Sequence, residues 1–132
     1  MQFDPSSPIW VQLASEFYRR IVVGEWVAGA KIAGVRELAG ELGVNPNTAQ
    51  RALSELEREG LCRSERTTGR FVTADQARID NLRADLAGEA ADSFISRARG
   101  FGMDQAQAQD LIEERWNRDD TDSDNPTQDQ GS

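Results

Sequence analysis

Histidine is absent from this chain of 132 residues, and cysteine occurs once, as Cys62. The missing histidine removes the usual catalytic base and the commonest metal ligand. A single cysteine excludes an intramolecular disulfide and favours a reducing compartment. The sequence also has no serine–histidine pairing, no glycine loop of the phosphate-binding type and no cluster of metal ligands. We therefore expect no enzyme, and neither a cofactor nor a metal ion.

Long hydrophobic runs are absent as well. The apolar stretches Ile9–Val11 and Ile21–Val23 contain only three residues each. A membrane-spanning helix needs about 20 apolar residues, and a signal peptide needs a continuous apolar segment. We therefore expect no membrane contact and a location in the cytoplasm.

The formal net charge of −8 is distributed unevenly. Residues 1–75 carry nine Lys or Arg against ten Asp or Glu, whereas residues 76–132 carry six against thirteen. Affinity for phosphate depends on local basic groups that release counterions, so an acidic total weakens nonspecific binding to nucleic acid without excluding specific binding. A local group of arginines lies in the first part, at Arg51, Arg58, Arg63, Arg66 and Arg70.

The segment from Val44 to Gly60 carries the strongest functional signal. Asn45 can cap a helix, and Pro46 fits the first helical position, where its missing N–H donor costs nothing. One face of this helix is apolar, with Ala49, Ala52, Leu53 and Leu56, and the other is polar, with Asn47, Arg51, Ser54 and Arg58 flanked by Thr48 and Gln50. Polar side chains crowded at a helix start predict a polar partner, and duplex DNA is the leading candidate. An ordinary core-packing helix with a solvated face is the alternative.

A second helix is predicted directly before this one. Val35, Leu38, Ala39 and Leu42 form a compact apolar stripe, and Gly43 offers a left-handed exit from the helix. Helix, glycine turn and helix is the helix-turn-helix pattern, in which the second helix enters the major groove. Many helical hairpins share that pattern, so it is weak by itself.

The order of residues is more specific than the pattern. The segments PIWVQLASEFYRRIVVGEW, VRELAGELGVNPNTAQRALSELEREGL and GRFV, within residues 8–73, resemble the GntR family of bacterial transcription regulators, most closely its short YtrA-type branch. The resemblance implies a mainly α fold with a small β-hairpin: a winged helix-turn-helix domain followed by a two-helix dimerisation segment. It also implies a homodimer that binds an inverted-repeat DNA operator and acts as a repressor, often of transporter operons.

The resemblance also implies which residues contact DNA. They are Arg36 in the first helix of the motif, Asn45, Asn47, Thr48, Gln50 and Arg51 at the start of the second, and Arg66, Thr68 and Gly69 at the tip of the hairpin, or wing. Arginine grips guanine and glutamine grips adenine through paired hydrogen bonds, so we expect Arg51 and Gln50 to read bases. Arg36, Asn45, Asn47 and Thr48 are expected to hold phosphates. Relatives differ at Ile32–Gly34, Gln50 and Thr67–Gly69, which affects the base preference of the site.

The remainder of the chain predicts two further helices. Ile79, Leu82, Leu86, Ala90 and Phe94 form one stripe, and Asp104 can cap a last helix with Ala108, Leu111, Ile112 and Trp116. Such a pair cannot bury its stripe alone, whereas a second copy would cover it. We therefore expect dimerisation through Leu82, Leu86, Phe94, Leu111, Ile112 and Trp116. An effector pocket for a small molecule, lined by Phe94, Phe101, Met103 and Trp116, is the alternative.

These observations divide the chain into three parts. Residues 1–75 form the expected DNA-binding domain, residues 76–117 a helical dimerisation or effector segment, and residues 118–132 an acidic disordered tail. The acidic balance and the altered wing leave one further hypothesis open, a winged-helix protein-interaction module without DNA binding. Within the wing, Arg63 and Arg70 are either DNA contacts or solvated strand charges, and Cys62 is more typical of a small buried residue than of a redox sensor.

Overall fold

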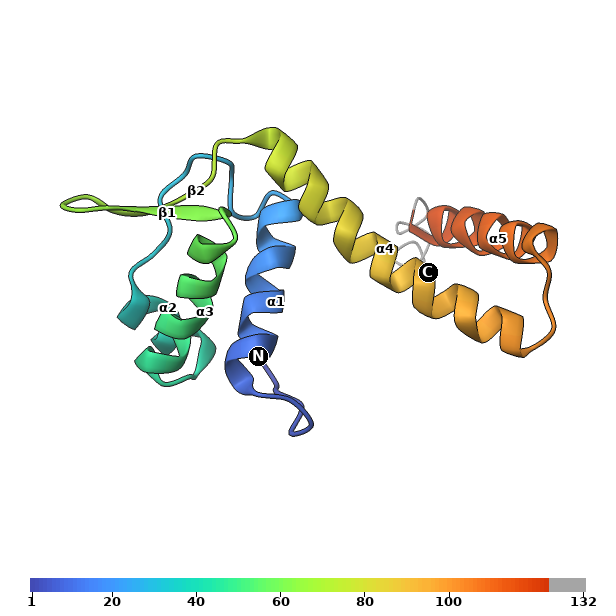
Figure 1. Cartoon of the computed structure of the whole chain (residues 1–132), viewed down its shortest axis with the longest axis horizontal. Helices are drawn as coiled ribbons and strands as arrows, with labels where there is room; N and C mark the ends of the chain where they lie inside the picture. Colours follow the sequence, from blue (N-terminus) through green and yellow to red (C-terminus); the bar gives the residue numbers. More distant parts are fainter. Residues whose placement is uncertain (124–132) are drawn as a thin grey trace, which may run out of the picture. The chain divides into compact units, whose positions relative to one another are not determined.

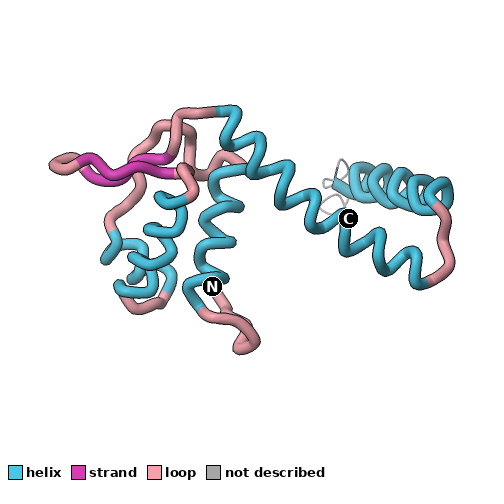
Figure 2. Tube along the Cα trace, viewed as in Figure 1, coloured by secondary structure: helices cyan, strands magenta, loops and turns pink. Residues whose placement is uncertain are grey.

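The computed structural model describes the backbone of residues 1–123 and the side chains of residues 1–119. In chain order the elements are α1 (Ile9–Val22), α2 (Val35–Leu42), α3 (Pro46–Arg58), β1 (Cys62–Glu65), β2 (Gly69–Val72), α4 (Gln76–Gly100) and α5 (Gln105–Ser123) (Figure 1). Within residues 1–123, five helices and one two-stranded antiparallel hairpin confirm the expected mainly α fold class (Figure 2). The contacts divide the chain into two compact units, which meet between Leu86 and Ala87. None of the helices described is both long and apolar enough to cross a membrane.

The core of the first unit lies where α1, α2 and α3 pack together. Leu13 and Phe17 of α1 and Leu53 of α3 are completely buried, as are the small residues Ala49 and Ala52 of α3. Burying one large apolar side chain contributes about 1.5–3 kcal/mol, and the two alanines let the helix backbones approach closely. The predicted apolar stripes of the two helices of the motif face this core, and the stripe of α3 fixes the rotation of that helix about its axis.

Local signals at the start of α3 act as the sequence predicts. The Asn45 side-chain oxygen accepts a hydrogen bond of 2.7 Å from the Asn47 backbone N–H, with Pro46 at the first helical position. Gly43 ends α2 with a φ of 70°, a conformation that is strained for other residues. The angle between the two helices of the motif is therefore specified by residues within the turn itself.

The wing is the β1–β2 hairpin, paired in the register Cys62 with Val72 through Glu65 with Gly69. Lys31 adds an isolated bridge to Phe71, and the Ile32 N–H donates to the Arg70 carbonyl at 2.8 Å. The loop before α2 is thus attached to the outer edge of the hairpin. Figure 1 shows the tip of the hairpin pointing away from α1, α2 and α3.

The first turns of α4 belong to the first unit, which differs from the expected division after residue 75. Leu82 is 6% exposed within the core, and Leu86 packs against it. Arg83 also donates to the Val22 carbonyl at the end of α1, at 2.7 Å. Of the two residues expected at a dimer interface, Leu82 is buried within one chain and Leu86 is half-buried against the same core, so a dimer contact at either stays a prediction.

The second unit contains the rest of α4 and α5. Asp104 caps α5 as expected: its carboxylate accepts from the Gln107 N–H, and its own N–H donates to the Gln107 side chain, both at 2.9 Å. The helix continues to Ser123, beyond the expected end of the helical segment at residue 117. The remainder of the expected acidic tail, residues 124–132, lies outside the described residues.

Candidate nucleic-acid interface

The outward face of α3 presents the polar side chains that the sequence assigned to it. Asn47, Gln50 and Arg51 are exposed and Thr48 is half-buried, whereas Ala49 and its neighbours on the other side are buried. Because successive helical residues point about 100° apart, the buried stripe determines the direction of these polar groups. Gln50 donates a hydrogen bond to the Ser54 hydroxyl at 3.1 Å, which orients its amide along the helix.

Asn45 already has a structural role at this end of α3. The side-chain oxygen of Asn45 accepts the cap hydrogen bond, which leaves the NH₂ group of the same side chain available for a partner. The start of a helix carries a partial positive charge that favours phosphate. Asn45, Asn47 and Thr48 are thus grouped at the part of α3 where an anionic backbone would be most favourable.

The Arg51 side chain contacts a residue that sequence reasoning did not select. Its guanidinium carbon lies 4.3 Å from the centre of the Trp10 ring, in the first turn of α1. A shallow depression of about 360 Å³ is lined by Ile9, Trp10, Asn47, Thr48 and Arg51. Trp10 is distant from Arg51 in sequence, and no local pattern in the chain indicates that the two side chains meet. The structure therefore extends the polar face of α3 onto the start of α1.

Three of the five grouped arginines have carboxylate partners within the unit. Arg58 pairs with Glu55, Arg63 pairs with Glu65, and Arg70 pairs with Glu57 at 3.1 Å. The hydrogen bond from Arg58 holds the pKa of Glu55 below its usual range. These pairs favour the interpretation of Arg63 and Arg70 as charges matched within the fold.

None of the three predicted contact arginines, Arg36, Arg51 and Arg66, has such a partner among the described residues. Arg36 in the first turn of α2 and Arg66 at the wing tip are both exposed, and neither makes an ion pair with the described part of the chain. Near Arg66, Thr68 donates to Glu65 at 2.8 Å, and Gly69 has a φ of +116°. These cations keep their full charge available for phosphate.

Lys31 is a basic residue of the wing that sequence reasoning missed. A Cβ added at Gly69 would lie 2.9 Å from the Lys31 Cε atom, so the lysine side chain passes directly beside the glycine. The Lys31 side chain is exposed, and the Lys31 backbone forms an isolated β-bridge with Phe71 of β2. Lys31 reaches the hairpin through backbone contacts that the sequence does not indicate: its bridge to Phe71, and the hydrogen bonds of Ala30 with Val72 and of Ile32 with Arg70.

Cys62 is buried behind this surface. Its thiol donates a hydrogen bond to the Leu53 carbonyl at 3.7 Å, and burial raises its pKa to about 11. A thiol with a raised pKa carries little reactive thiolate at neutral pH. The structure therefore agrees with a small buried residue rather than a redox sensor.

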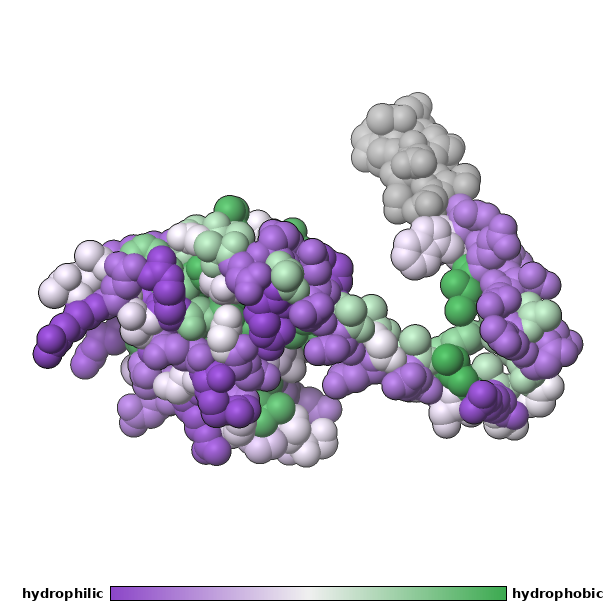
Figure 3. Space-filling model, turned by 45° about the horizontal axis from the view of Figure 1, so that its top comes forward, coloured by the Kyte–Doolittle hydropathy of each residue, from purple (hydrophilic) through white to green (hydrophobic). Residues whose placement is uncertain are grey.

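The second unit carries an apolar groove of about 420 Å³ between α4 and α5. Phe94, Met103 and Ile112 are among its lining residues, and Ile112 is 47% exposed. Figure 3 shows hydrophobic residues on the facing sides of these two helices. Trp116 and Leu111 line an adjoining hollow with Phe94, and Trp116 is 68% exposed. Four of the six expected dimerisation residues, Phe94, Leu111, Ile112 and Trp116, therefore lie together around these two hollows of the second unit.

Comparison with known proteins places this arrangement among transcription regulators. Residues 11–72 match the family of bacterial regulatory proteins called the gntR family. The chain is similar to the HTH-type transcriptional regulator YhcF of Bacillus subtilis, with 36% identity over 102 residues that cover 77% of this chain and 84% of YhcF. It is also similar to the HTH-type transcriptional repressor YtrA of the same organism, with 37% identity over 55% of this chain and 58% of YtrA.

Solved structures show the same likeness. A GntR family transcriptional regulator from Listeria monocytogenes superposes with a TM-score of 0.80 and 38% identity, covering 85% of this chain and 98% of that one. The AraR DNA-binding domain, solved in complex with operator ORX1, superposes with a TM-score of 0.51 and 28% identity. That match covers 55% of this chain and 93% of the AraR chain.

Proposed function

This chain belongs to the gntR family of bacterial regulatory proteins, and we propose that it represses transcription as a homodimer bound to an inverted-repeat DNA operator. The membership confirms the resemblance drawn from the sequence and identifies a helix-turn-helix transcriptional regulator rather than an enzyme. Operator binding is supported by the AraR domain, which was crystallised on its operator. A regulator of this kind acts on the chromosome, so we place it in the cytoplasm.

In the proposed complex, α3 lies in the major groove. Gln50 and Arg51 reach base edges, since their side chains can each form paired hydrogen bonds with a purine. Arg36, Asn45, Asn47 and Thr48 hold phosphates and thereby fix the register of the helix. Arg66, Thr68 and Gly69, at the tip of the wing, contact the neighbouring backbone or minor groove. The observation that carries this proposal is the outward polar face of α3, which the buried alanine and leucine stripe holds in place.

The dimer is proposed to form through the second unit. Phe94, Leu111, Ile112 and Trp116 present apolar surface that a second copy would remove from water. Two related reading helices then require half-sites about one helical turn, or 34–36 Å, apart. A small-molecule effector bound in the groove between α4 and α5 would change how the two copies pack, and so the spacing of the reading helices.

Dimerisation is tested by sedimentation velocity at working concentration. Ile112→Asp places a charge in the apolar groove and should shift the protein from dimer to monomer, because an unpaired charge is costly to bury. Glu113→Gln changes the charge of the adjacent exposed residue and should leave the dimer intact. A wild-type protein that sediments as a monomer would contradict the proposed assembly.

DNA binding is tested by selecting bound duplexes from a random pool and measuring the affinity for the most enriched duplex by fluorescence anisotropy. If Arg36, Arg66 and Lys31 each neutralise one phosphate in both subunits, the plot of log K against log salt should fall with a slope of about −5. Absence of duplex binding even at low salt would contradict the proposal. It would instead favour the protein-interaction module, which the internal pairing of Arg58, Arg63 and Arg70 with carboxylates supports.

A further inference from the structure

We propose that Trp10 is a positioning residue for DNA recognition, which holds the guanidinium group of Arg51 over its indole ring and directs the N–H edge of that group toward a base. This role rests on the DNA-binding function proposed above. The pair joins the first turn of α1 to the reading helix α3.

The geometry distinguishes this pair from the other contacts between a cation and a ring. The Arg51 carbon lies 4.3 Å from the ring centre, whereas the corresponding distances are 5.6 Å for Arg20 over Trp26 and 5.2 Å for Arg63 over a phenylalanine. Those two arginines also pair with carboxylates. For Arg51, the indole face is the interaction that the structure provides.

The nearest acid on the same helix face is already occupied. Glu55 lies one turn after Arg51, but its two carboxylate oxygens accept hydrogen bonds from Nε and Nη2 of Arg58. Among the described residues, Arg51 forms no ion pair. Arg58 therefore leaves Arg51 free to associate with Trp10 instead of folding back along α3.

Contact through a ring face suits base reading better than an ion pair does. A guanidinium group is planar, and its five N–H donors all lie in that plane. An aromatic ring attracts the face of the group and leaves these donors available, whereas a carboxylate would occupy two of them. Two in-plane donors are what the O6 and N7 acceptors of guanine require.

The surroundings of Trp10 agree with this role. Trp10 is half-buried and Arg51 is exposed, so the ring has a fixed position while the cation remains accessible. The depression beside them is also lined by Asn47 and Thr48, the proposed phosphate contacts. The pair and the start of α3 thus form one continuous surface.

A double-mutant cycle tests the proposal on the duplex that the wild-type protein selects. Trp10→Leu removes the aromatic face but keeps apolar bulk, and it should weaken binding by about 2- to 5-fold, the range for exposed cation–π contacts. It should also reduce discrimination against a duplex in which the contacted guanine is replaced. Trp10→Phe, which keeps a ring face, should restore most of both. In an Arg51→Ala background, Trp10→Leu should have no further effect.

Arg97→Ala is the matched control, because it removes one positive charge at an exposed position of α4 that takes no part in the proposed DNA surface. It should leave base discrimination as in the wild type. Circular dichroism melting shows whether each variant folds. Arg51→Lys keeps the positive charge and leaves Trp10 unchanged but loses the planar guanidinium group. It should therefore lose base discrimination as Trp10→Leu does.

A second measurement separates failure of this proposal from failure of the proposed function. In NMR spectra of the free protein, the indole ring current should shift the Arg51 Hδ signals upfield, and Trp10→Leu should abolish that shift. Unshifted signals, unchanged affinity in Trp10→Leu, or an equal loss in the Arg51→Ala background would each overturn the positioning role. A wild-type protein that selects no duplex would overturn DNA binding itself, and the recognition role of Trp10 with it, whereas the NMR result would still show whether the pair exists.

Discussion

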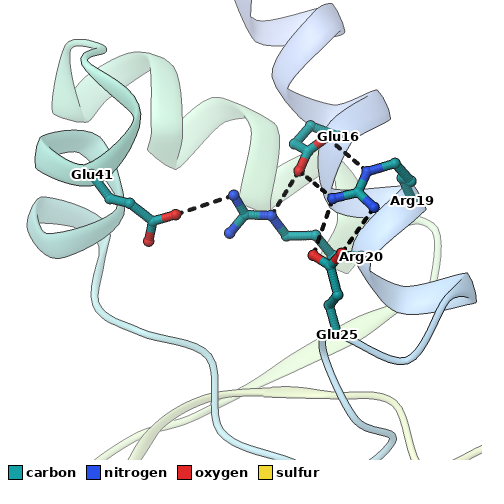
Figure 4. Close-up of polar contacts among 5 residues, drawn as sticks. All are labelled: Glu16, Arg19, Arg20, Glu25 and Glu41. Carbon is teal, nitrogen blue, oxygen red and sulfur yellow. Dashed lines mark hydrogen bonds and ion pairs between the residues drawn. The ribbon is translucent and has the colours of Figure 1, made fainter. Parts of the chain in front are cut away.

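The ion-pair network around Glu16 allows a quantitative prediction. Its carboxylate accepts hydrogen bonds from Nε and Nη2 of Arg19, at 3.0 and 2.9 Å, and from Nε of Arg20 at 2.9 Å (Figure 4). Arg20 extends to Glu41 of α2 at 3.1 Å, and Arg19 to Glu25 in the following loop. Glu16 therefore orients the arginine that links α1 to the first helix of the DNA-binding motif.

The magnitude follows from the titration of Glu16. Hydrogen bonding to Arg19, with a further contribution from Arg20, lowers the pKa of Glu16 from 4.5 to about 2, although partial burial opposes the shift. At about 1.4 kcal/mol per pKa unit, this corresponds to an upper limit of about 3 kcal/mol. Because the Arg19 side chain is 48% exposed, solvent screening reduces the expected contribution to about 1–2 kcal/mol.

The sign of the pH dependence is fixed by the direction of the shift. The folded-state pKa lies below the unfolded value, so the stabilisation is fully present above pH 4.5 and is lost as the pH falls toward 2. Glu16→Gln keeps the size of the side chain and removes its charge. It should lower the free energy of unfolding by about 1–2 kcal/mol at pH 7, and the difference from wild type should shrink below pH 4.5.

Urea unfolding of both proteins between pH 7 and pH 2.5, at one protein concentration, measures this difference. Other carboxylates with a lowered pKa, such as Glu57, titrate in both proteins and cancel in the subtraction. Glu89→Gln, at an exposed position without an ion pair to the described residues, is the control and should give no difference at any pH. A deficit in Glu16→Gln that stays constant across the pH range would refute the electrostatic reasoning.

Three further predictions concern the motif and its surroundings. Asn45→Ala should lower the free energy of unfolding by about 1 kcal/mol through loss of the cap, while Asn45→Asp keeps the acceptor; equal losses in urea titrations of both would contradict the assignment. Burial raises the pKa of the Cys62 thiol to about 11, so iodoacetamide should modify the folded protein far more slowly than the urea-unfolded protein at pH 7.5. Arg51→Ala should weaken operator binding by about 1–3 kcal/mol and relax discrimination at one base, and unchanged anisotropy titrations would remove Arg51 from base reading.

The helix-turn-helix could be predicted because its signals are local. The cap at Asn45, the glycine at residue 43 and the period of the α3 stripe each depend on residues within one or two helical turns. For the same reason the outward direction of Gln50 and Arg51 followed from the sequence. The helical periodicity fixes both faces once one of them is buried.

Contacts between distant segments could not be predicted in this way. Nothing in the α1 sequence indicates that Trp10 lies against Arg51, because the crossing of α1 and α3 determines that contact. The pairing of Arg70 with Glu57 depends likewise on how the hairpin meets α3. The apolar stripe of α4 runs continuously through Leu82 and Leu86 to Phe94. Its period therefore cannot show which of these side chains pack against the core of the first unit and which do not.

Site-directed cleavage by a tethered iron chelate tests the placement of α3 in the major groove most directly. The chelate is attached to an Asn47→Cys variant, with Cys62→Ala to exclude the native thiol, and the labelled protein is incubated with the selected duplex. We predict two cleavage sites of equal strength, related by the two-fold axis and separated by about one helical turn or a multiple of it. Cleavage that is absent, or scattered without symmetry, from a protein that still binds the duplex would contradict the account.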